Sequence, residues 1–150
     1  MRFSPDSGKE GTAMIHRKTL TEDQARQAMQ NGELGSDVRT SSRYVAVILT
    51  QDWCPQWPAM QRWMASLQQK GKPEDVNIDV YDLEYNRISF ADQFMRFKEN
   101  VLGNQLIPYV RYYIDGELVA ETNFVMRDAF FKAFGLPSSR ISDEGATSRP

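Results

Sequence analysis

Two short stretches of the chain have the hydrophobic pattern of sheet strands. Residues 44–49 are continuously apolar and bounded by polar residues, which is typical of a strand covered on both faces. Residues 76–81 alternate between apolar and polar side chains and predict a second strand. Between them, residues 56–69 carry large apolar side chains at helical spacing. A strand, a helix and a strand in this order predict a right-handed crossover that sets the two strands parallel.

The second half of the chain predicts an antiparallel hairpin. Residues 109–114 and 117–121 flank Asp115-Gly116, a pair that favours a two-residue hairpin turn. With the two parallel strands, the hairpin completes an expected mixed α/β sheet of four strands.

Three further helices are expected around this sheet. Thr21 and Gln24 have the spacing of a capping box, which begins an extra helix near the N-terminus. Asn86 is expected to cap a helix that runs to about residue 100, and Asn123 a last helix that ends at Gly135. Together with the helix over 56–69, they place helices on both faces of the sheet.

The two ends of the chain differ in composition from the middle. Residues 1–12 and 138–150 are rich in small, polar and charged side chains, and such segments bury too little apolar surface to offset the entropy of ordering. We therefore expect a disordered tail at each end and one folded domain over residues 19–135. His16, the only histidine, falls in the loose arm before that domain.

Charge and hydropathy exclude two classes of partner. The chain has 18 basic and 20 acidic residues and a net charge of −2, without the basic stripe that a nucleic-acid interface needs. The longest apolar run, residues 44–49, is far shorter than the roughly 18 residues of a membrane span. We expect neither nucleic acid nor a membrane as a partner.

The single cysteine, Cys54, limits the chemistry further. One cysteine cannot form an intrachain disulfide, and with His16 as the only other soft ligand we expect no metal site. The N-terminal residues also lack the apolar segment of a secretory signal. These features favour a cytoplasmic protein in a reducing environment.

Cys54 follows a predicted strand and precedes a predicted helix. Pro55 would occupy the first helical position, where its missing N–H costs nothing. Backbone N–H groups and the helix dipole at such a position lower the pKa of a thiol and make it reactive. A free cysteine is also often a small core side chain, and the sequence leaves both interpretations open.

The chain over residues 44–135 resembles the thioredoxin fold. Trp53-Cys54-Pro55 is similar to the first part of a Trp-Cys-x-x-Cys active site, and Cys-Pro is also the glutaredoxin form. Ile107-Pro108, directly before a strand, is similar to the second signature of the family, in which the proline is cis. The resemblance implies a thioredoxin-like mixed sheet in which Pro108 faces Cys54.

Two departures from the family pattern change the expected activity. Trp57 stands at the position of the second cysteine, and Ile48 at that of a buried acidic residue which assists proton transfer in thioredoxins. Without a second thiol the chain cannot act as a dithiol disulfide reductase. Monothiol glutaredoxins, which bind glutathione or an iron–sulfur cluster, match poorly, and we expect no cofactor.

The resemblance places the candidate site around Cys54 as the reacting thiol. The groove residues would be Trp53, Pro55, Trp57, Ile107 and Pro108, and the partner an extended protein segment or a small thiol. Trp57 has a second interpretation as a core side chain. The function expected is monothiol thiol–disulfide exchange or redox-linked binding; the alternative is a redox-inactive protein-binding module. The sequence does not decide whether the protein is an enzyme.

Overall fold

The computed structural model describes residues 13–67 and 76–137. The stretches 1–12 and 138–150, for which we predict tails, lie outside the described residues.

One mixed sheet of five strands forms the centre of the protein. The strand order is β2-β4-β3-β5-β6. β4 pairs in parallel with both β2 and β3, β5 is antiparallel to β3, and β6 is antiparallel to β5. The strands are β2 Ala13–Thr19, β3 Tyr44–Thr50, β4 Val76–Glu84, β5 Tyr109–Ile114 and β6 Glu117–Thr122. The parallel crossover and the hairpin are confirmed.

The prediction of four strands was wrong by one. Residues 13–19 form β2 at the edge of the sheet, and His16 lies within it, so it is not part of a loose arm. The His16 ring nitrogen is 2.7 Å from the Asn77 side-chain oxygen on β4. Arg17 and Lys18 of β2 form ion pairs with Asp82 and Asp79 of β4 at 2.8 and 3.1 Å.

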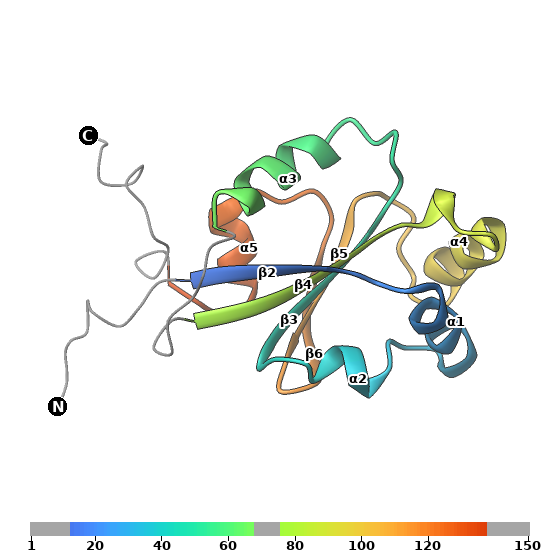
Figure 1. Cartoon of the computed structure of the whole chain (residues 1–150), viewed down its shortest axis with the longest axis horizontal. Helices are drawn as coiled ribbons and strands as arrows, with labels where there is room; N and C mark the ends of the chain where they lie inside the picture. Colours follow the sequence, from blue (N-terminus) through green and yellow to red (C-terminus); the bar gives the residue numbers. More distant parts are fainter. Residues whose placement is uncertain (1–12, 68–75, 138–150) are drawn as a thin grey trace, which may run out of the picture.

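Helices cover both faces of the sheet (Figure 1). One core cluster joins the sheet to α3 and α5, and a second joins the opposite face to α1, α2 and α4. These helices are α1 Glu22–Asn31, α2 Ser36–Arg39, α3 Trp57–Ala65, α4 Ala91–Asn100 and α5 Arg127–Ala133, with the 3-10 turn η2 Tyr85–Arg87 between β4 and α4. No helix within residues 13–67 and 76–137 is long and apolar enough to cross a membrane.

The helix ends follow the sequence signals only in part. The capping box of Thr21 and Gln24 is present, and Gly32 ends α1 with a φ of 79°. Asn86 lies in η2, however, and α4 begins after Phe90 without a side-chain cap. Asn123 also caps nothing, because α5 begins after Met126. Both asparagines instead bind loops far from them in sequence.

Candidate functional site

Cys54 lies in the loop that joins β3 to α3. Its backbone N–H donates to the Gln51 carbonyl at 3.1 Å, and the Trp57 N–H donates to the Cys54 carbonyl at 3.2 Å. Because residues 51–57 form these two turns, α3 begins at Trp57 and not at Pro55. Pro55 itself is exposed. The residue Cys54 is only 3% exposed and belongs to the core cluster beneath α3.

The two tryptophans beside Cys54 have opposite environments. Trp53 is 64% exposed, with its indole N–H on the Gln51 side-chain oxygen at 2.7 Å. Trp57 is 2% exposed, packs in the same core cluster as Cys54, and donates its indole N–H to Glu84 at 2.9 Å. The structure therefore supports the core interpretation of Trp57 and leaves Trp53 available to a partner.

A short run after β4 anchors the Cys54 loop. Asn86 accepts from the Asp52 backbone N–H at 2.9 Å and donates to the Asp52 carboxylate at 2.7 Å. Arg87 donates to the same carboxylate at 2.7 Å, and the Gln51 amide donates to the Tyr85 hydroxyl at 3.2 Å. Because the Asn86 and Arg87 bonds favour the ionised form, they lower the pKa of Asp52. The loop is thus held from outside its own sequence.

Tyr85 connects this anchor to the core. Its residue is 2% exposed and packs on Phe94 of α4, with ring centroids 5.6 Å apart. Burial raises the pKa of Tyr85 above its ordinary value, and the negative charge of an ionised Cys54 adds to the rise. The phenol therefore stays neutral at physiological pH and serves as a hydrogen-bond partner of the loop.

The second predicted part of the site is the loop before β5. The Ile107–Pro108 peptide bond is cis. Pro108 is buried, whereas Ile107 is half-buried and packs against both core clusters, including the one that holds Cys54 and Trp57. Leu106, one residue earlier, is 63% exposed. The structure thus joins Cys54, Trp57 and Ile107 through one cluster.

Polar side chains that the sequence did not single out hold this second loop. The side chains of Asn104 and Asn123 exchange hydrogen bonds at 2.9 and 3.1 Å. Asn123 also donates to the Pro108 carbonyl at 3.0 Å, and Lys98 donates to two carbonyls of the loop. No local motif marks these contacts, because the partners come from α4, the loop and the end of the hairpin.

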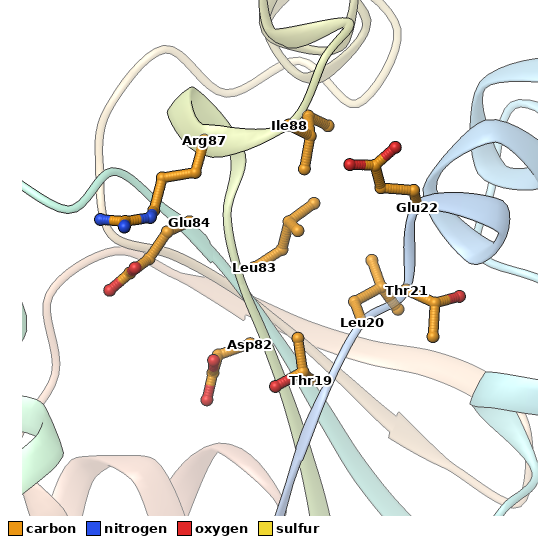
Figure 2. Close-up of a pocket in the computed structure, with 9 residues that line it drawn as sticks. All are labelled: Thr19, Leu20, Thr21, Glu22, Asp82, Leu83, Glu84, Arg87 and Ile88. Carbon is orange, nitrogen blue, oxygen red and sulfur yellow. The ribbon is translucent and has the colours of Figure 1, made fainter.

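A cavity of about 430 Å³ lies at the carboxyl ends of β2 and β4 (Figure 2). The Asp82 and Glu84 carboxylates lie on one side of it and Glu22 on the other, with apolar side chains between them. Burial raises the pKa of Asp82 in spite of its bond to Arg17. The cavity is lined by Thr19, Leu20, Thr21, Glu22, Asp82, Leu83, Glu84, Arg87 and Ile88, so none of the predicted site residues contributes to it.

Within residues 13–67 and 76–137, no group of three or more potential ligands among His, Cys, Asp and Glu is placed to hold a metal ion. His16 lies in β2 and binds Asn77, so the structure gives it no role beside Cys54.

The anchor of the Cys54 loop leads to a first prediction. We expect Asn86→Ala to raise the rate of Cys54 alkylation by iodoacetamide in the native protein by roughly fivefold, because two hydrogen bonds that hold the loop are lost. Mass spectrometry of the intact protein measures the rate. Asn31→Ala, at the exposed end of α1, is the control and leaves it unchanged. Equal rates for the two variants would show that Asn86 does not restrain the loop.

Comparisons with known proteins identify the fold. No protein-family model matches the chain, and no curated protein matches it in sequence. Oxidized thioredoxin O1 from Arabidopsis thaliana is similar in structure, with a TM-score of 0.51 and 13% identity over 83% of this chain and 95% of that one. Thioredoxin O2 from the same plant gives 0.49 and 14% over 83% and 91%. A buckwheat glutaredoxin–glutathione complex gives 0.46 and 17% over 81% and 99%. The first likeness confirms the predicted thioredoxin-like fold.

Proposed function

We propose that this chain is a monothiol, redox-linked binding protein that takes an extended protein segment or a small thiol at Cys54. The observation that carries the proposal is the arrangement of the Cys54 loop. Three residues that follow β4, Tyr85, Asn86 and Arg87, anchor it, and Ile107 packs on the cluster that contains the cysteine. A thiol fixed in this way meets its partner in one defined orientation.

The proposed chemistry is one thiol–disulfide exchange. The Cys54 thiolate attacks one sulfur of a partner disulfide, a new bond forms between Cys54 and that sulfur, and the other partner sulfur leaves as a thiolate that takes up a proton. The chain has no second cysteine, so the mixed disulfide persists until an external thiol such as glutathione attacks it. A cytoplasm that supplies reduced thiols suits this cycle.

Exposed apolar side chains in the two loops of the proposed site support binding of a chain segment. Trp53 is 64% exposed and Leu106 is 63% exposed, one in each of the two loops that form the site. Tryptophan is among the residue types that contribute most to binding surfaces. Pro55, also exposed, extends the Trp53 side of this surface.

The burial of Cys54 favours a second candidate function. With only 3% of the residue exposed, the sulfur reacts only if a partner or a loop movement uncovers it. The alternative is therefore a redox-inactive thioredoxin-fold module that binds a protein segment through Trp53 and Leu106. Both candidates use the same groove, and they differ in whether Cys54 forms a covalent bond.

Formation of a mixed disulfide at Cys54 in the native protein separates the two. We expect Cys54 of the native protein to form a 1:1 mixed disulfide with an aromatic disulfide reagent. Mass spectrometry of the intact protein detects the adduct, and Cys54→Ser gives none. A peptide disulfide should react more slowly with Trp53→Ala than with the control Leu118→Ala, which changes an exposed side chain of β6.

Two results would decide against thiol chemistry. The absence of an adduct under native conditions leaves only the binding module. Equal peptide rates for the Trp53 and Leu118 variants would remove Trp53 from the groove.

A further inference from the structure

Lys98 is a buried cation beneath one wall of the proposed groove. It lies on α4, and the residue is 0% exposed. Its ammonium donates to the Asn104 and Leu106 backbone carbonyls, each at 2.8 Å, and lies 5.5 Å from the centroid of the Tyr109 ring. None of the ion pairs found in residues 13–67 and 76–137 involves it. Burying an ammonium without a carboxylate is costly, and packing alone does not explain it.

The bonds of Lys98 are part of a set that fixes the loop over residues 104–108. Asn123 donates to the Leu106 carbonyl at 3.3 Å and to the Pro108 carbonyl at 3.0 Å. The Leu106 N–H donates to the Asn104 side chain at 3.0 Å. The carbonyls of Asn104, Leu106 and Pro108 therefore each accept a hydrogen bond from Lys98 or Asn123. Since the backbone is held from below, the Leu106 side chain remains 63% exposed.

We propose that Lys98 is a positioning residue that holds the loop over residues 104–108 in place under the partner. We call the conformation in which Lys98 binds the loop carbonyls closed, and one in which these bonds are broken open. Opening of the loop is coupled to uptake of a proton by Lys98. The closed loop keeps the Lys98 nitrogen in a dry site against two carbonyls and an aromatic ring. The open loop returns it to water. The part of the inference that concerns a partner rests on the proposed function, whereas the coupling to protons does not.

The direction of the coupling follows from the charge. Burial lowers the pKa of Lys98 from 10.5 to about 8 in the closed loop, although the charge of Glu99, the next residue on α4, opposes this. In the open loop the ordinary value applies. Between these two values the open loop binds more protons than the closed one, so raising the pH favours closure. Below about pH 8 both forms are protonated, and the opening equilibrium no longer depends on Lys98.

The other groups around Lys98 do not titrate in this range. Burial raises the pKa of Tyr109 on β5 to about 12, and its hydroxyl is bound to Glu121 and Arg111. Arg111 keeps its charge throughout. The remaining neighbours, Asn104 and Asn123, carry no titratable group. A transition near pH 8 in this loop is therefore specific to Lys98.

NMR of the full chain with labelled lysine and methyl groups tests the coupling. We expect the Lys98 side-chain carbon to titrate with a midpoint near 8, and the Leu106 and Ile107 methyl resonances to shift with the same midpoint. Relaxation dispersion should show the open population falling by about tenfold per pH unit above the midpoint, the limit for release of one proton. Lys98→Met removes the dependence, while Lys132→Met, which changes an exposed lysine of α5, leaves it intact.

The effect on a partner is measured as a ratio of two rates. We divide the rate at which Cys54 reacts with a peptide disulfide by its rate with an aromatic disulfide. The intrinsic reactivity of the thiol is common to both rates and cancels in the ratio. We expect Lys98→Met to lower this ratio roughly fivefold, because the loop loses the two hydrogen bonds that Lys98 donates to its carbonyls, and Lys132→Met to leave it unchanged.

Each result has one meaning. A titration midpoint of Lys98 at its ordinary pKa overturns the coupling, and so do Leu106 methyl resonances that do not shift with the same midpoint. The wild-type protein supplies both measurements, so the test does not depend on whether Lys98→Met folds. If Cys54 reacts with neither disulfide, the proposed function fails while the NMR titration still decides the loop. Equal rate ratios for the two variants would overturn the positioning role.

Discussion

Trp57→Ala is expected to lower the free energy of unfolding by about 3–5 kcal/mol, the usual cost of removing a large aromatic side chain from a packed core. Trp57 is 2% exposed, lies in the core cluster with Met60 and Met64, and donates its indole N–H to Glu84. The small replacement leaves a cavity beneath the Cys54 loop. Alkylation of Cys54 should therefore become faster as well.

Urea unfolding measures this change, and the neighbouring tryptophan supplies the control. Trp53→Ala alters an indole that is 64% exposed, so we expect a change within roughly 0.5 kcal/mol. Trp57→Phe keeps most of the packing and loses the bond to Glu84, for an expected cost of about 1–2 kcal/mol. Similar losses for the two alanine variants would contradict the core position of Trp57.

Glu33→Ala is expected to be the second large loss, about 3 kcal/mol, because it breaks a buried polar network. Arg111 is 5% exposed and donates to the Glu33 carboxylate at 2.6 Å and to the Tyr113 and Tyr109 hydroxyls at 2.8 and 2.7 Å. Burial acts to lower the pKa of Arg111, but its interactions with Tyr113 and Glu33 raise this pKa above its ordinary value. Arg111 therefore remains positively charged. Without Glu33, Glu121 at 3.8 Å is the one carboxylate of residues 13–67 and 76–137 that still forms an ion pair with Arg111.

A double-variant cycle tests this network. Arg111→Met removes the buried charge, so Glu33→Ala should cost much less in that background than in the wild type. Glu117→Ala, an exposed carboxylate of β6, is the control and should change stability by less than about 0.5 kcal/mol. Additive losses from Glu33 and Arg111 in urea unfolding would show that the two side chains act independently.

The elements predicted well are those whose signals are local. The continuous apolar run of β3, the helical spacing of α3 and the Asp115-Gly116 turn each lie within a few residues. In the structure Asp115 and Gly116 have φ angles of 50° and 83°, the left-handed pair that a two-residue hairpin needs. The capping box of α1 is local in the same sense, and it was also found.

The strand that was missed depends on distant partners. β2 pairs along its whole length with β4, and its Arg17 and Lys18 meet carboxylates there that are more than sixty residues away in the sequence. Its own sequence has only a short apolar start. The same limit explains Asn86 and Asn123. Each has the residue type of a helix cap, but the bonds that the structure gives them reach loops that the sequence does not place nearby.

In the candidate site, too, the sequence revealed only the features whose signals are local. The position of Cys54 after a strand and the signature at Ile107-Pro108 were visible in the sequence. The residues that hold these loops, Lys98 and the run from Glu84 to Arg87, were not, because nothing local distinguishes a buried lysine or an anchoring asparagine from a surface one.

The position of β2 has a consequence for any attempt to shorten the chain. A fragment that starts at residue 20 would strip the outer side of β4, a nine-residue strand, and leave its amides and carbonyls open to pairing with another molecule. In the intact protein, Arg17 and Lys18 protect this edge, since charged side chains on an edge strand discourage pairing with the sheet of another molecule.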